Sequence, residues 1–183
     1  VATAGLSSAG HNFMESIRKA ADGAEYRHVT YDGGNPAVVA TVSGETDLTT
    51  QLAVEQAEMI RGKRIRPLAT VSDRPLEIEG YGTIEPISKT IPGFKAPANY
   101  FGIFIPKGVP AEVVATVQDI WTKNIANNAA VKAYAVNKGA LFAPVAGDAA
   151  LAAAMPAIQA NAWLLHSTGK TKVAPDTVGI PKP

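Results

Sequence analysis

The stretch Thr3-Ala4-Gly5-Leu6-Ser7-Ser8-Ala9-Gly10-His11 joins an apolar, strand-like start of the chain to a helical pattern. Most of its side chains are small, so the backbone amides stay accessible. Amides at a helix start point outward at the positive end of the helix dipole, so an anion can bind them without Lys or Arg. Ser7, Ser8 and Thr3 could add hydroxyl donors. The same residues also suit an ordinary helix cap, and the stretch alone does not separate these two roles.

Outward from this stretch, short apolar runs alternate with helical patterns, which predicts an α/β fold with a parallel sheet covered by helices. We expect strands at 1–4, 26–31, 47–50 and 65–71, and helices at about 13–21, 35–44 and 52–61. Gly23 should end the first helix. In the second, Asn35 is the expected N-cap, Pro36 follows it, and Gly44 closes the end.

A second strand-to-helix turn, Tyr31-Asp32-Gly33-Gly34-Asn35-Pro36, contains glycines that allow close backbone approach. Ligands in open α/β sheets bind outside the carboxyl ends of the strands, so both turns should face one crevice. The strand at 47–50 would bring Thr49 or Thr50 to the same edge.

Residues 72–97 are rich in proline and glycine with little periodicity, so we place a domain boundary there. Beyond it we expect a buried strand at 100–105, an amphipathic helix from Pro110, a helix at 129–137 and a strand at 140–145. A final helix, capped by Asp148, should run to about Thr168. Pro156 should kink that last helix, and the last dozen residues should form an extended or frayed tail.

Composition excludes several classes of function. The 17 Lys and Arg residues against 16 acids give a net charge of +1 without a basic stripe, which argues against nucleic acid as a partner. The absence of cysteine excludes disulfides and thiolate chemistry. No run approaches the roughly 20 apolar residues of a membrane span. His11, His28 and His166 have no metal-ligand spacing, so no metal and no cofactor is expected.

Two alternatives remain open. Ser7 and His11 lie four residues apart and could share a helix face, as a serine hydrolase would require, but the stretch lacks the second glycine of a Gly-x-Ser-x-Gly elbow. We therefore expect no catalytic residue, and we expect His11 to be a packed or capping histidine. A regulatory effector-binding module could share the same two-lobed architecture.

A collinear series of motifs spans about residues 1–168 and resembles the tripartite tricarboxylate transporter receptor family, also called Bug proteins. The series consists of Thr3-Ala-Gly5 to Gly10-His11, His28 to Ala37, Ser43-Gly44 to Asp47, Arg61-Gly62-Lys63, Ile65 to Ala69, Ser72-Asp-Arg74-Pro75, Ile91-Pro92-Gly93-Phe94 and Tyr100 to Pro110. The strength of the resemblance lies in the order of the motifs.

The resemblance implies a type II periplasmic-binding-protein-like fold of two lobes. Residues 1–97 would form the second lobe, and residues 98–183 would return to the first lobe and end in an extended tail. The N-terminal part of the first lobe has no counterpart in this sequence, so the chain should hold half a site. Exposed apolar surface should then favour self-association.

The same resemblance implies a periplasmic receptor that captures a small carboxylate for a cognate membrane permease. The ligand would be a di- or tricarboxylate, an acidic amino acid or an aromatic acid. Gly5, Leu6, Ser7 and Ser8 would contribute amides and hydroxyls, and Thr3, Gly34 and Thr49 would line the wall. Asp47 could hold an amino group, although a buried cap of the next helix is the expected role.

Overall fold

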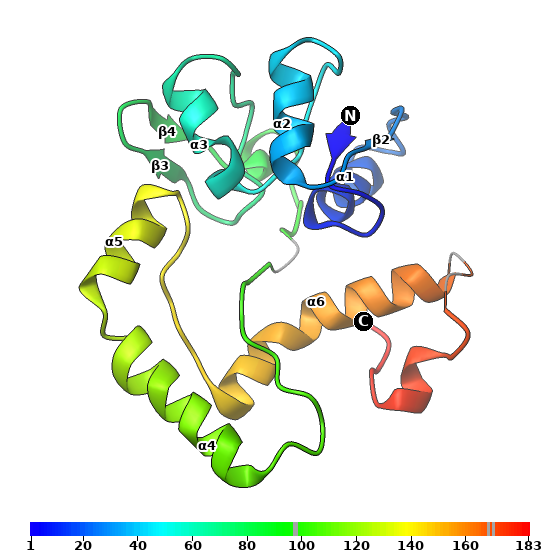
Figure 1. Cartoon of the computed structure of the whole chain (residues 1–183). Coiled ribbons are helices and arrows are strands. Elements are labelled where there is room, and N and C mark those ends of the chain that lie inside the picture. The colour runs from blue at the N-terminus through cyan, green and yellow to red at the C-terminus, as the bar shows by residue number, and fades with distance from the viewer. Residues whose placement is uncertain (97–98, 168, 170) are drawn as a thin grey trace. The chain divides into compact units, whose positions relative to one another are not determined.

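The computed structural model describes residues 1–96, 99–167, 169 and 171–183. The chain divides into two compact units (Figure 1). Unit 1 consists of Val1–Pro97 with Asn137–Ala140, and unit 2 consists of Ala98–Val136 with Leu141–Pro183. The candidate site lies in unit 1.

Unit 1 is built around a small parallel sheet. Strand β1 (Ala2–Thr3) pairs with β2 (Val29–Thr30), with Ala2 opposite Val29 and Thr3 opposite Thr30. A parallel bridge joins Ala2 to Thr49 on the other side of β1. The expected strand at 26–31 is thus shorter than predicted, and the one at 47–50 is reduced to a bridge. The parallel direction of all three segments agrees with the sequence pattern.

Three helices of unit 1 follow the strand segments. They are α1 (Ala9–Ala20), α2 (Gly34–Val42) and α3 (Ala53–Arg61). Helix α2 lies against β1 and α3, where it buries Ala37, Val38 and Ala40 (Figure 1). After α1, Gly23 adopts a positive φ of 82°, and its amide donates to Arg18 O, as expected of a glycine that ends a helix.

The expected N-cap of α2 was wrong by two residues. The cap is Gly33, and the helix begins at Gly34, so Asn35 and Pro36 lie inside the first turn. Gly33 has a φ of 113°, which a residue with a side chain rarely adopts, so the chain enters the helix through glycine rather than through an asparagine cap. Gly44, with a φ of 81°, follows the helix end as predicted.

The proline-rich segment contains a hairpin that the sequence did not indicate. Strand β3 (Leu76–Ile78) pairs antiparallel with β4 (Gly82–Ile84), followed by the short 3₁₀ helix η1 (Ile87–Lys89). Ile78 and Ile84 pack with Ile60 in a buried cluster. The predicted strand at 65–71 is wrong: only Thr70 forms a bridge, to Pro86, and Pro67 has no amide to contribute to a ladder.

Unit 2 contains the expected helices. Helix α4 (Ala111–Asp119) follows Pro110 and continues as a π-helical stretch, η2 (Ile120–Ile125). Helices α5 (Ala129–Asn137) and α6 (Gly147–Ser167) follow, with Pro156 inside α6. Asp148 lies in the first turn of α6 rather than at its cap, and Thr168 lies outside the described residues. Among the described helices, none combines the length and apolar content that a membrane crossing requires.

The two strands predicted in unit 2 do not form. Residues 100–105 and 140–145 carry no regular structure, and Phe101, Ile103 and Phe104 are 71%, 67% and 70% exposed. A strand needs a partner to satisfy its backbone, and in the described part of the chain neither segment pairs with another strand. Apolar composition alone therefore misled the prediction.

The C-terminal tail is more ordered than predicted. It contains the 3₁₀ helix η3 (Pro175–Val178), in which Pro175 is buried. The indole of Trp163 on α6 donates to Ile180 O at 3.2 Å and to Pro181 O at 3.0 Å. His166 Nδ1 on the same helix lies 3.0 Å from Thr171 Oγ1. Side chains of α6 thus hold the tail in place, and the expectation of a frayed end was wrong.

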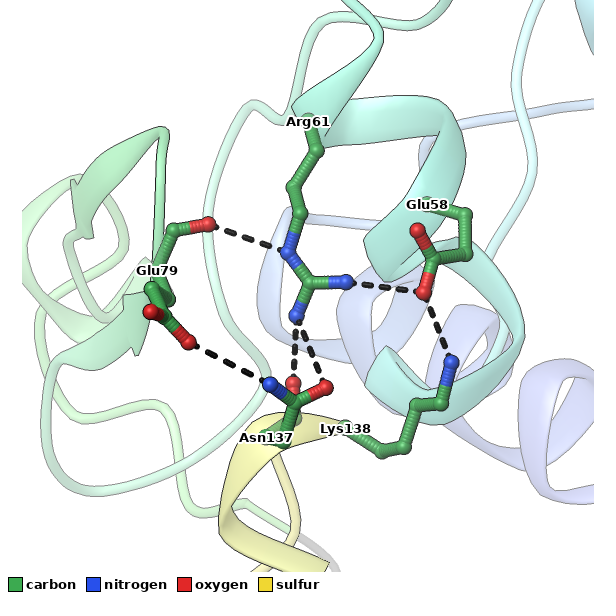
Figure 2. A network of polar contacts seen from close by, with 5 residues as sticks. All are labelled: Glu58, Arg61, Glu79, Asn137 and Lys138. Carbon is green, nitrogen blue, oxygen red and sulfur yellow. Dashed lines mark hydrogen bonds and ion pairs between the residues drawn. The ribbon is translucent and has the colours of Figure 1, made fainter. Parts of the chain in front are cut away.

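Residues 137–140 belong to unit 1 through a network around Arg61 (Figure 2). The Arg61 guanidinium donates to Glu79 O at 3.0 Å, to Glu58 Oε1 at 2.8 Å and to Asn137 O. Lys138 Nζ also reaches Glu58 Oε1, at 2.7 Å, and Asn137 Nδ2 donates to Glu79 Oε2 at 3.2 Å. One side chain therefore joins α3, the β3–β4 hairpin and the end of α5.

Replacement of Arg61 should loosen unit 1. Because Arg61→Ala removes the donor to two backbone carbonyls that water can still reach, we expect the free energy of unfolding to fall by about 0.5–1.5 kcal/mol. Urea unfolding measures the change. Arg64→Ala is the matched control, since Arg64 is exposed and lies in the turn that follows the same helix. Equal stability of the two variants would contradict the role given to Arg61.

Candidate functional site

The candidate site lies at the carboxyl edge of the small parallel sheet. Residues 4–8 follow β1, residues 31–34 follow β2, and Thr49 is bridged to β1, so all three segments end at one edge. This convergence agrees with the prediction. Gly5 has a φ of 118° and Ser7 a φ of 64°, so the first turn combines two left-handed residues.

The first turn presents free backbone donors. Within the described residues, the amides of Gly5, Leu6 and Ala9 donate to no acceptor of the protein. The amide of Ser8 instead donates to Gly5 O at 3.3 Å, and that of Ser7 donates to His11 Nδ1 at 3.1 Å. Ser8 is the N-cap of α1, and its Oγ accepts from the His11 amide at 3.3 Å. The turn therefore serves both as a helix cap and as a set of unpaired amides at the positive end of α1.

Two stacked histidines support this turn. The rings of His11 and His28 lie 4.5 Å apart between centroids and only 6° from parallel. His28 Nε2 lies 2.5 Å from Thr3 Oγ1, which also donates to Gly5 O at 3.3 Å. If the Thr3 hydroxyl proton points to Gly5, His28 Nε2 must carry the proton that it shares with Thr3. As expected, His11 is a packed histidine.

The electrostatics around the pair favour neutral imidazole at His28. Burial lowers the pKa of His28, and the neighbouring His11 and N-terminal amino group lower it further, while Glu15 acts in the opposite sense. Burial acts to raise the pKa of Glu15, but hydrogen bonds from Tyr26 and Arg18 lower it overall. These two groups make the stability of unit 1 sensitive to acid.

On the far side of the edge, Gln51 and Glu55 join the strand ends to α3. In the amide orientation that satisfies its neighbours, Gln51 accepts from the Ala4 amide at 2.7 Å and donates to Glu55 Oε2 at 3.0 Å. Glu55 also accepts from the Leu52 amide at 3.1 Å. Its carboxylate lies so close to Gly34 that a Cβ there would be 2.0 Å from Oε1. A side chain at Gly34 would therefore displace the Glu55 carboxylate from its bond with the Leu52 amide.

The predicted site residues differ in their exposure. Thr3 is fully buried, and its hydroxyl is occupied by the contacts described above. Leu6 is 58% exposed, and Gly34 is buried at the start of α2. Thr49 Oγ1 donates to Ala2 O at 3.0 Å, which holds the third segment on the sheet.

Three residues at this edge were not foreseen, namely His28, Gln51 and Glu55. A glutamate at the third position of a helix is a recognisable capping residue, so Glu55 could have been found from the sequence. The predicted role of Asp47 as a buried cap is wrong, because Asp47 is exposed and Glu55 bonds the Leu52 amide in its place.

The arrangement does not form a hydrolase dyad. The His11 imidazole accepts from the backbone amide of Ser7, so its Nδ1 is occupied by a main-chain donor rather than by a serine hydroxyl. Across the described residues, no group of three His, Asp or Glu side chains could hold a metal ion.

Comparison with known proteins identifies the class. The structure is similar to that of R. palustris Rpa4515 with adipate, with a TM-score of 0.70 and 20% identity, over 92% of this chain and 55% of that one. The likeness shows the predicted α/β fold of the type II periplasmic-binding-protein kind.

The family follows from the sequence comparisons. The model of the tripartite tricarboxylate transporter family receptor matches residues 1–163, and the chain belongs to that family. A UPF0065 protein in the tcbD-tcbE intergenic region of Pseudomonas sp. (strain P51) is 33% identical over 126 residues, which are 68% of this chain and 37% of that protein. The chain thus spans about a third to a half of the length of the relatives it matches.

Acid should destabilise the protein in the range where histidine titrates. Because the pKa of His28 is lowered in the fold, the unfolded chain binds a proton at higher pH than the folded one. Stability is then fully present above about pH 6.5 and falls as the pH drops through the folded pKa of His28. Urea unfolding between pH 7.5 and 4.5 measures this slope. His28→Gln should flatten it, and an unchanged slope in that variant would assign the effect to other groups.

Gly10 should tolerate no side chain. A Cβ at this position would lie 1.9 Å from the backbone oxygen of Thr50, whose hydroxyl donates to Gly10 O at 2.8 Å. We expect Gly10→Ala to lower the free energy of unfolding by roughly 1–3 kcal/mol through overpacking. Gly102→Ala is the control, because its Cβ would make only ordinary contact, 3.8 Å from Phe104. Similar melting temperatures for both variants would contradict the close approach.

Proposed function

We propose that this chain is the ligand-gripping part of a periplasmic receptor that captures a small carboxylate and delivers it to a membrane permease of the tripartite tricarboxylate type. Membership of the receptor family supports the receptor role. The observation that carries the choice of ligand is the set of unpaired amides of Gly5, Leu6 and Ala9 at the start of α1. Such donors suit a carboxylate and need no basic side chain.

In this proposal each predicted residue has a specific task. Gly5 and Leu6 offer amides, while Ser7 and Ser8 add hydroxyls beside them. Thr3 stabilises the turn through the hydrogen bond from its hydroxyl to Gly5 O. Gly34 and Thr49 form the wall, on the adjacent segments of the same edge. A hydrogen bond to a charged acceptor contributes about 1.5–3 kcal/mol. Two or three amides would therefore supply much of the binding free energy of one carboxylate.

The proposal also assigns the two parts of the chain. Residues 1–97 would form the second lobe of a two-lobed receptor, and residues 98–183 would belong to the first lobe. The ligand would be a di- or tricarboxylate, an acidic amino acid or an aromatic acid. The structural relative that was solved with adipate makes a linear dicarboxylate the natural first probe.

A screen of acids tests the ligand class. We expect adipate or another di- or tricarboxylate to raise the melting temperature, because a ligand that binds only the folded state stabilises it. Adipamide, which matches adipate in shape without its charge, and neutral sugars are the controls. Stabilisation by sugars but by no acid would refute the carboxylate hypothesis.

A proline substitution tests the amides directly. Ala9→Pro removes one N–H at the first helical position, where proline is well tolerated, and the extended backbone of Ser8 (φ −65°, ψ 161°) suits a residue that precedes proline. We expect the affinity for the acid to fall roughly 10- to 100-fold, the equivalent of one charged hydrogen bond. Ala9→Ser retains the amide and should bind normally. Equal affinities would remove the Ala9 amide from the site.

Unit 2 supports a further proposal, self-association. Phe101, Ile103, Phe104 and Leu141 are each about two-thirds exposed or more, which is unusual for large apolar side chains. We expect light scattering to detect dimers or larger species at high concentration, and Phe104→Asp to reduce them. Leu68→Asp, which changes a similarly exposed residue of unit 1, should not. A monomer at every concentration would contradict the proposal.

A further inference from the structure

Ser7 has an unfavourable backbone conformation that requires support. Its φ of 64° lies in the left-handed region, which a residue with a Cβ occupies only when neighbouring contacts hold it there. Two contacts from α1 hold it: the Ser7 amide donates to His11 Nδ1 at 3.1 Å, and Asn12 Nδ2 donates to Ser7 O at 3.4 Å. Of these two contacts, the shorter one, to His11, is the one that changes with protonation. His11 lies in the first turn of α1, and Ser7 lies in the loop that precedes the helix.

We propose that His11 is a positioning residue: its neutral imidazole holds the Gly5–Ser8 turn in the shape that presents amides to the carboxylate, and its protonation releases the turn and the ligand. This inference rests on the proposed function, since it assigns the control of that same site. It differs from ligand contact, because His11 acts through the main chain of Ser7.

The hydrogen-bond chemistry gives the direction of the effect. Nδ1 can accept from the Ser7 amide only while it carries no proton, because imidazolium is a donor at both nitrogens. Protonation therefore replaces an attractive contact with two opposed N–H groups. The amide of Ser7 must then turn away, and the left-handed conformation keeps only the weaker contact from Asn12 Nδ2 to Ser7 O.

The second histidine links the other end of the turn to the same pair. His28 stacks on His11 at 4.5 Å and contacts Thr3 Oγ1, which donates to Gly5 O. Two imidazolium rings at this separation would repel each other, so the stack favours the neutral state of both. The Gly5 end of the turn thus depends on the position of His28, and the Ser7 end depends on the charge of His11.

Several charged and titratable groups face the pair. Helix α1 contributes Glu15 and Arg18, and the segment before β2 contributes Glu25 and Tyr26. The Val1 amino group, just before β1, also acts on His28. The Glu15 carboxylate is already occupied by Tyr26 Oη at 2.6 Å and by Arg18 at 3.0 Å. These side chains and both histidines line an open cleft of about 360 Å³, so protons from solvent reach the rings.

The test compares two variants of His11 on the whole chain. In His11→Asn a carboxamide oxygen can replace Nδ1 as acceptor but does not titrate, whereas His11→Ala removes the acceptor. The first readout needs no ligand: NMR follows the Ser7 amide shift and its hydrogen exchange from pH 8 to pH 5. We expect the wild-type amide to titrate with His11 and to lose protection in acid, the Asn variant to stay protected, and the Ala variant to exchange rapidly throughout.

The second readout is the affinity for adipate over the same pH range. We expect wild-type affinity to fall about tenfold from pH 8 to pH 5, the Asn variant to bind independently of pH, and the Ala variant to bind weakly throughout. His28→Gln, which retains a donor toward Thr3, should keep the loss of affinity in acid but move it to higher pH, because it removes the neighbouring ring that disfavours the charged His11. Tighter binding in acid would overturn the proposal, since it would make His11 a cationic contact of the ligand.

Two further outcomes distinguish the positioning role of His11 from the proposed binding of a carboxylate. A Ser7 amide that ignores the titration of His11, or an Ala variant with wild-type affinity and pH profile, would overturn the positioning role. A Ser7 amide that titrates as expected, with no adipate binding at any pH, would support the positioning role and count against a dicarboxylate of this size as the ligand.

Discussion

The backbone hydrogen bonds of β1 determine where the candidate site lies. Val29 N donates to Val1 O, Tyr31 N to Thr3 O, and Ala2 N to Leu48 O, all between 2.8 and 2.9 Å. These bonds hold three segments from distant parts of the sequence in parallel on a fully buried two-residue strand. Because side chains alternate along a strand, a slip of one residue would expose Thr3 and separate it from His28. The whole edge thus depends on this register.

The elements that the sequence predicted well are those with a local cause. Helix α3 has its apolar positions at helical spacing, and α5 was predicted with its observed bounds. The glycines after α1 and α2 ended those helices as expected. The alternation of strands and helices indicates a parallel sheet. From that topology it follows that the turns at residues 4–8 and 31–34 lie at the same edge of the sheet. The order of the motifs along the chain indicated the family, and the family model that matches residues 1–163 confirmed that prediction.

The elements that were missed depend on contacts between distant residues. Residues 100–105 are apolar enough for a strand but have no partner strand among the described residues, so they stay irregular. The hairpin of β3 and β4 has strands of only three residues, too short for a clear alternation. The stacking of His11 on His28 joins residues 17 positions apart and leaves no pattern in the sequence. The occupied hydroxyl of Thr3 likewise becomes visible only with the structure.

The Arg61 network also constrains the order in which the chain can fold. Arg61 and Asn137 are 76 positions apart in sequence, and Glu58 and Lys138 are 80 apart. On a ribosome, α3 and the hairpin emerge long before the residues that complete their outer face. Closing so long a loop costs conformational entropy that grows slowly with loop length, while the network forms only after closure. The first unit therefore reaches its final form late in synthesis, after most of the second unit's helices have been made.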